Sequence, residues 1–121
     1  VGAWFELMAE MGTDSEAGQK ARASLGEASA TDQAGYEAQL AGMKMFWQPA
    51  DAVAFIGSDE AYEAMDSVRQ FSFEKGLLGE GADSPDFVGI AMPDGKTLGD
   101  TANIKLRFDT EYMQMAADGA L

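Results

Sequence analysis

The sequence predicts a mostly helical fold with one small antiparallel β-hairpin, and two patterns indicate this. Apolar residues recur three and four positions apart through much of the first 75 residues, which is the spacing of one face of a helix. Several of these segments follow Ser, Thr or Asp and stop at Gly, as helices commonly do. The strongest turn signal, Pro93-Asp94-Gly95, separates two short apolar runs. At 121 residues, the chain is expected to form one domain over residues 1–121.

Five helices are expected before residue 76. The fifth is the best marked, because Ser58 supplies its N-cap and one face is traced by Tyr62, Met65, Val68 and Phe71 or Ser72. In the first, the helical spacing is carried by Trp4, Leu7, Met8 and Met11. Gly12, Gly26, Gly42, Gly57 and Gly76 are the expected ends. The predicted helices are residues 2–11, residues 16–25, a short helix after Thr31 or Asp32, residues 49–56 and residues 59–75.

The last third of the sequence predicts a loop, a hairpin, a strand and a final helix. Gly, Asp, Ser and Pro are dense over residues 76–89. The hairpin arms are Phe87–Met92 and Lys96–Leu98. Ile104, Leu106 and Phe108 alternate with Lys105 and Arg107, the period of a half-buried strand, and Asp109 caps a last helix.

The charge balance argues against nucleic acid and membranes as partners. Asp and Glu number 21 against 8 Lys and Arg, a formal net charge of −13 at pH 7. A surface of that sign repels phosphate backbones and anionic lipids, and it favours solubility. No stretch approaches the roughly 20 apolar residues of a membrane helix. We therefore expect no nucleic-acid partner and no direct membrane insertion.

No enzyme active site, cofactor or metal is expected. The chain has neither Cys nor His, which removes thiolate nucleophiles, imidazole bases and the commonest zinc ligands. Asp83, Ser84 and Asp86 lie close in sequence but lack the regular ligands and closing Glu of a calcium loop. The glycines at 76, 79 and 81 follow a helix, so they indicate a cap and a connector and not a phosphate cradle.

An apolar run outside any clear helix face marks a candidate interface. Its residues are Met43, Met45, Phe46 and Trp47, and Phe5 is added from the first helix. Such a patch is normally covered by another domain or a second copy, so we expect contact with a missing part of a longer protein, or a homodimer of this chain. Four other methionines fit core positions: Met8, Met11, Met65 and Met113. Arg69, Lys105 and Arg107 can bind an anion, but salt bridges to the many carboxylates are the more ordinary use.

An ordered series of segments resembles the tail of the nitrate/taurine-type periplasmic substrate-binding proteins of ABC importers. The series includes the start Gly2-Ala3-Trp4-Phe5-Glu6 and these further segments: Met45–Ala52, Met65–Gly79, Val88–Gly95, Leu106–Asp109, Tyr112-Met113 and Ala116–Gly119. Residues 13–42 carry little of the resemblance, and none of the segments is catalytic. Gln48 stands where Thr or Ser is expected before the Pro, which weakens the start of that helix.

The resemblance implies the C-terminal helical part of a type II periplasmic-binding-protein fold, about the last third of a two-lobed clamshell. The parent protein would be periplasmic or lipid-anchored outside the cytoplasm, and would deliver a small anionic or nitrogen- or sulfur-containing solute to a membrane permease. Because Val1 leads directly into a helical pattern, we expect a longer parent chain. Gly2, Ala3 and Trp4 are the candidate ligand-binding residues, since a helix N-terminus is a natural anion seat.

A second hypothesis is a small stand-alone helical module that binds a protein partner through residues 43–47 and no solute. The sequence does not name the solute, because nitrate, sulfonates and pyrimidine precursors share this tail.

Overall fold

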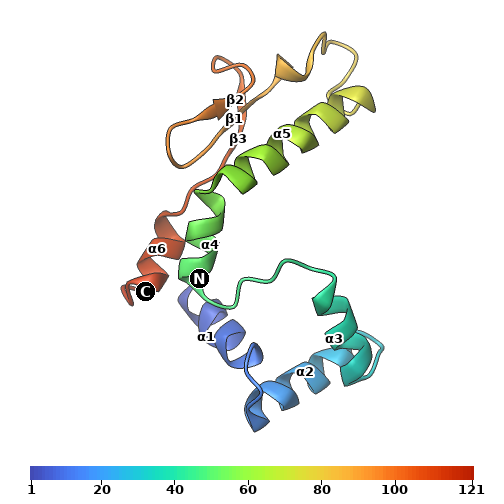
Figure 1. Ribbon diagram of the computed structural model, residues 1–121, viewed down its shortest axis with the longest axis vertical. Coiled ribbons are helices and arrows are strands. Elements are labelled where there is room, and N and C mark those ends of the chain that lie inside the picture. The colour runs from blue at the N-terminus through green and yellow to red at the C-terminus, as the bar shows by residue number, and fades with distance from the viewer. The chain divides into compact units, whose positions relative to one another are not determined.

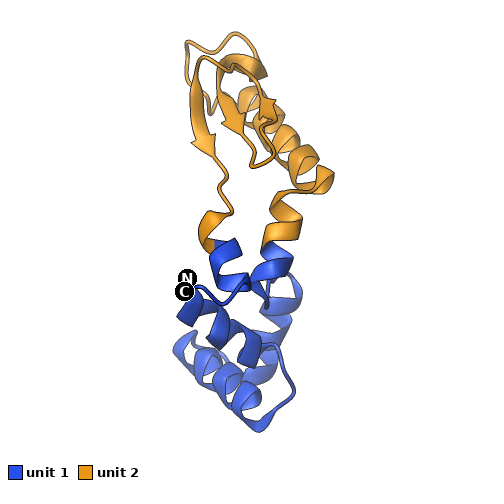
Figure 2. Cartoon of the chain, turned by 90° about the vertical axis from the view of Figure 1, so that its left-hand side faces the viewer, with its two compact units in different colours: residues 1–52, 113–121 blue, residues 53–112 orange.

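The computed structural model describes residues 1–121 as six α-helices, one short 3₁₀ turn and a small three-stranded mixed sheet. The predicted fold class, mostly helical with a small hairpin, is confirmed at that level. The chain divides into two compact units, residues 1–52 with 113–121 and residues 53–112 (Figure 2). The assignment of residues 1–121 to one domain stays a prediction.

The first unit is helical. It contains α1 (Gly2–Met11), α2 (Glu16–Ala28), α3 (Gln33–Ala41), the start of α4 (Pro49–Ile56) and most of α6 (Glu111–Ala117) (Figure 1). α2 packs against both α1 and α3. The buried apolar side chains are Phe5, Met8 and Met11 of α1, with Leu40 and Ala52.

Side chains cap the helices where the sequence predicted. The Ser15 hydroxyl accepts a hydrogen bond from the Gly18 N–H at 2.9 Å, and the Asp32 carboxylate accepts one from the Gly35 N–H at 2.8 Å. Each cap satisfies a main-chain donor that the first turn of a helix leaves unpaired. The predicted starts of α2 and α3 are thus confirmed.

The predicted end of α2 at Gly26 is wrong, because the helix continues to Ala28. Gly26 is buried, and a Cβ there would lie 2.8 Å from the Asp32 carbonyl oxygen, so the glycine serves close packing. The turn comes at Ala30, whose φ is 57°. The Thr31 N–H donates to the Gly26 carbonyl at 2.9 Å and the Ala30 N–H to Glu27 at 3.1 Å, the pattern of a Schellman cap.

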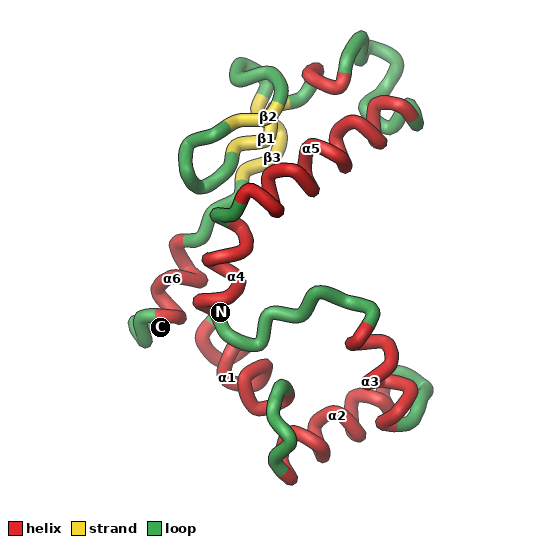
Figure 3. Tube along the Cα trace, viewed as in Figure 1, coloured by secondary structure: helices red, strands yellow, loops and turns green.

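The second unit places α5 (Asp59–Glu74) beside the sheet (Figure 3). The Ser58 hydroxyl accepts from the Ala61 N–H at 3.2 Å, and Gly76, with φ 69°, ends the helix as predicted. The 3₁₀ turn η1 (Pro85–Phe87) interrupts the predicted loop. On the face of α5 traced by the helical spacing, Tyr62, Met65 and Ser72 are half-buried, whereas Val68 and Phe71 are exposed.

The sheet has the order β2-β1-β3, with β1 (Gly89–Ala91), β2 (Thr97–Leu98) and β3 (Ile104–Arg107). β1 and β2 pair antiparallel, with Ile90 opposite Leu98, which confirms the predicted hairpin. β3 adds to the other side of β1 in parallel. This requires residues 99–103 to cross over β1. They pass so close that a Cβ on Gly89 would lie 2.1 Å from the Asp100 carbonyl oxygen.

The core of this unit lies between α5 and the sheet. Ala61, Ile90, Met92 and Leu98 are buried, and the half-buried Phe55, Tyr62, Met65 and Phe108 pack around them. Lys96 links the hairpin to the start of α5. Its ammonium lies 3.1 Å from the carboxylate of Asp59, the first residue of α5, and 3.0 Å from that of Asp94 in the hairpin turn. It also stands over the Tyr62 ring, 5.6 Å from the centroid.

Candidate binding surface

A cleft of about 280 Å³ lies within the first unit. Three chain segments form its wall: the first turns of α1, the start of α4 and the end of α6. The lining residues are Gly2, Phe5, Glu6, Ala9, Gln48, Pro49, Ala116, Ala117, Gly119 and Leu121. Two helices therefore begin at this cleft.

The cleft is lined mostly by apolar or small residues, with Glu6 and Gln48 as the polar side chains and no cation. The first N–H groups of a helix have no partner within the helix and carry partial positive charge, so the start of α1 offers donors here, whereas Pro49 at the start of α4 has no N–H. Glu6 is the only ionisable side chain in the lining. No Lys or Arg is present to form an ion pair with an anion. The cleft is suited to hydrogen bonding with a small polar group, and not to strong binding of an anion by itself.

The three predicted ligand-binding residues separate in the structure. Gly2 lines the cleft, whereas Ala3 and Trp4 are exposed and are not part of its lining. Trp4 has 60% of its surface exposed. Phe5, predicted at an interface, is buried and forms part of the cleft wall. The roles assigned to these four residues stay predictions.

The apolar run of residues 43–47 is partly buried. Met43 is 54% exposed, while Met45, Phe46 and Trp47 are half-buried. The Trp47 ring lies on Gly12, where an added Cβ would come within 2.8 Å of the ring. Gly12 thus ends α1 as predicted, but in a right-handed conformation, and the absent side chain makes room for Trp47. The interface role of Met43, Met45, Phe46 and Trp47 is untested by this geometry.

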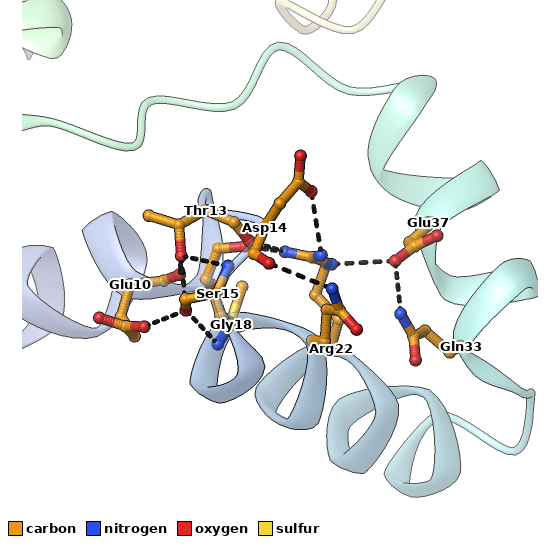
Figure 4. Close-up of polar contacts among 10 residues, drawn as sticks. Glu10, Thr13, Asp14, Ser15, Gly18, Arg22, Gln33 and Glu37 are labelled. Atoms are coloured by element: carbon orange, nitrogen blue, oxygen red, sulfur yellow. Dashed lines mark hydrogen bonds and ion pairs between the residues drawn. The ribbon is translucent and has the colours of Figure 1, made fainter.

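A buried arginine that the sequence analysis did not single out connects the first three helices. Arg22, on α2, is only 9% exposed (Figure 4). One of its terminal nitrogens donates to the Met11 carbonyl at 2.5 Å and the Thr13 carbonyl at 2.7 Å, and its Nε donates to Glu37 of α3 at 2.9 Å. Asp14 lies 3.7 Å from the other terminal nitrogen.

The sequence held a signal for this network. Gly18, Arg22 and Gly26 are four residues apart, so they share one face of α2, and all three are buried. A Cβ on Gly18 would lie 2.6 Å from both the Glu10 and Thr13 carbonyl oxygens. Gln33 donates to Glu37 at 2.8 Å, and this bond, with the one from Arg22, holds the pKa of the Glu37 carboxyl below its usual range.

Arg69 has a similar place in the second unit. It is 9% exposed and forms ion pairs with Asp66 on its own helix and with Asp86 in η1, which confirms the salt-bridge prediction for this residue. Burial alone would lower the pKa of Arg69, but the two carboxylates outweigh it and raise that pKa. Lys105 and Arg107 are exposed and form no ion pair, so the salt-bridge prediction is wrong for them.

The fold thus defines a mostly helical chain with a small mixed sheet. None of its helices is both long enough and apolar enough to cross a bilayer. No protein-family model, curated protein or solved structure matches the chain.

Proposed function

We propose that this chain is the C-terminal segment of the solute-binding component of an ABC import system for a small anionic or nitrogen- or sulfur-containing solute. The parent protein would work outside the cytoplasm and deliver its solute to a membrane permease. The ordered series of segments from Gly2 to Gly119 that resembles the nitrate/taurine-type proteins supports this proposal.

The geometric observation that carries the proposal is the incomplete cleft in the first unit. Gly2 and Pro49 bring two helix starts to a space of about 280 Å³, just below the usual range of about 300–1,000 Å³ for small-molecule sites. The lining has no cation, so an anionic solute would need further groups. Such an arrangement fits a site to which another lobe of a parent protein contributes the remaining contacts.

The native size and solute binding of the protein test the proposal together. An antibody raised against this chain should recover from its source cells a protein well above 12.8 kDa, the mass of the 121 residues. Calorimetry with nitrate, taurine and an alkanesulfonate should show binding to that parent protein and none of useful affinity to the 121-residue chain. A native protein of 12.8 kDa, or micromolar binding by the chain alone, contradicts the proposal.

The second candidate function is a stand-alone helical module that binds a protein partner and no solute. One observation favours its stand-alone character: Trp47 packs on Gly12 and Met45 and Phe46 are half-buried, so much of the apolar run is accommodated without another lobe, and Met43, 54% exposed, is the part open to a partner. The antibody experiment separates the two functions, since this module requires a native protein close to 12.8 kDa.

A further inference from the structure

The outer edge of the small sheet is open. β3 lies at the end of the order β2-β1-β3, and the backbone of residues 104–107 forms no hydrogen bond beyond its ladder with β1. Lys105, Leu106 and Arg107 are all exposed, Leu106 to 44%. An edge of this kind presents unpaired N–H and C=O groups with which another extended segment can pair.

Two cations at this edge have no ion-pair or cation–π partner, in contrast to the other cations of the second unit. Of the five cations in the second unit, Arg69 and Lys96 form ion pairs and Lys75 stands over the Phe71 ring. Lys105 and Arg107 have no such partner, although the chain has 21 carboxylates against 8 cations. Two unneutralised cations therefore flank an exposed Leu106 on a strand that is paired on one side only.

Charged edge strands often serve to prevent pairing between copies of a protein. Here the two cations disfavour pairing with the β3 strand of a second copy, because that pairing would place cations against cations. An acidic strand would neutralise them, and its own main chain would extend the ladder. We propose that β3 binds an extended acidic segment of a partner protein, which joins the sheet as a fourth strand with carboxylates opposite Lys105 and Arg107.

The register of β3 determines what the segment must contain. Leu106 and Arg107 stand opposite Ile90 and Ala91, whereas Lys105 is the extra residue of a β-bulge between Ile104 and Leu106. Acidic residues along the segment can meet the two cations, and an apolar residue among them can contact Leu106. This docking edge belongs to the second unit and does not depend on the proposed transport role.

Three synthetic peptides, each capped at both ends and fluorescently labelled, test the proposal with the full 121-residue chain. The first alternates Glu and Val. The second has Lys in place of Glu, and the third is the Glu peptide with every second amide N-methylated. Fluorescence anisotropy should show binding of the first peptide only. Its affinity should fall as salt is added, because exposed charge pairs are screened.

Two double variants provide the control. Lys105→Glu with Arg107→Glu should lower the affinity for the Glu peptide by about tenfold or more. Lys20→Glu with Lys75→Glu makes the same change in net charge at exposed positions away from β3, on α2 and just after α5, and should leave the affinity within about twofold. Circular dichroism checks that both variants keep their fold.

Four results would overturn the proposal. Equal binding of the Lys peptide removes the role of charge, and equal binding of the N-methylated peptide removes strand addition. Equal losses of peptide affinity in the two double variants would show that the peptide does not bind specifically at Lys105 and Arg107. Absence of peptide binding, with self-association of the chain abolished by the Lys105 and Arg107 changes, identifies the occupant as a second copy.

Discussion

Ala30 is the only residue other than glycine with a positive φ, 57°, and it makes the turn between α2 and α3. A side chain in this left-handed region costs about 1 kcal/mol or more, which is why glycine usually occupies this position of a Schellman cap. Gly76 and Gly119 occupy the corresponding positions after α5 and α6, with φ values of 69° and 68°. Ala30 is thus the exception among three caps of the same kind.

We predict that Ala30→Gly stabilises the chain by about 0.5–1 kcal/mol, because relief of the strained φ exceeds the added chain entropy of glycine. Ala28→Gly, two residues earlier and within the helix, is the matched control. It should destabilise by about the same amount. Urea unfolding followed by circular dichroism measures both. Destabilisation by Ala30→Gly would mean that the cap is not strained.

At the scale of elements, α1, α2 and α3 depend on one side chain. Arg22 is buried and satisfies two carbonyl oxygens between α1 and α2 while it pairs with Glu37 of α3. Its loss would leave these acceptors without the donor, and hydrogen bonds to charged groups contribute about 1.5–3 kcal/mol. The arginine therefore helps to fix the helices that present Gly2 at the cleft.

Arg22→Met should destabilise the chain by about 2–3 kcal/mol, since methionine keeps most of the side-chain length but none of the donors. Lys20→Met, at an exposed site on the same helix, should change the stability by less than about 0.5 kcal/mol. Hydrogen exchange should show faster exchange across α1 to α3 in Arg22→Met only. Equal effects of the two substitutions would show that the network contributes nothing.

The ion pair between Asp66 and Arg69 on α5 predicts a pH dependence. The hydrogen bond from Arg69 holds the pKa of the Asp66 carboxyl below its usual range, although partial burial acts in the opposite direction. A carboxyl with a lowered pKa in the folded state stabilises that state above the unfolded pKa. This stability is lost as the pH falls below about 4, through the lowered folded pKa.

Asp66→Asn should therefore cost about 0.5–1 kcal/mol at pH 7, the range of a partly exposed ion pair, and much less near pH 2. Glu63→Gln, an exposed position on the same helix, is the control and should show a smaller dependence. Urea midpoints measured from pH 7 to pH 2 give the comparison. A cost of Asp66→Asn that grows with acidity would contradict the assignment.

Local rules accounted for much of the secondary structure, and contacts distant in the sequence account for what they missed. Ser15, Ser58 and Gly76 act where capping chemistry places them. Gly26 was misjudged because its role depends on the close approach of Asp32. The parallel addition of β3 depends on Gly89 allowing residues 99–103 to cross. Such contacts do not appear in the periodicity of a single segment.

The candidate site was predictable only in part for the same reason. Gly2 was identified from its place at a helix start, and it does line the cleft. Glu6 and Ala117 line it as well, but nothing in their local sequence indicates that α6 returns to α1. Trp4 was selected for the same reason, its place at the helix start, yet its side chain is 60% exposed and does not line the cleft.

At the scale of the whole molecule, exposed apolar surface competes with a large like charge. In the first unit Trp4, Leu7 and Met43 are 60%, 50% and 54% exposed, and in the second unit Val68 and Phe71 are 51% and 55% exposed. Contiguous apolar patches larger than a few hundred Å² are rare on monomers. A net charge of −13 opposes any association of copies.

We predict that the 121-residue chain forms a symmetric dimer through the α1 surface around Trp4, and that added salt strengthens it. Salt screens the repulsion between the acidic chains, with a Debye length of about 10 Å at 0.1 M and about 3 Å at 1 M, while apolar contacts persist. Sedimentation velocity at low and high salt should show the shift from monomer towards dimer. Trp4→Glu should abolish it, whereas Phe71→Glu, which replaces an equally exposed aromatic in the other unit, should not. A monomer under both conditions would show that the exposed apolar side chains of α1 do not form a dimer interface. Loss of the dimer in Phe71→Glu, but not in Trp4→Glu, would show that the interface lies on α5.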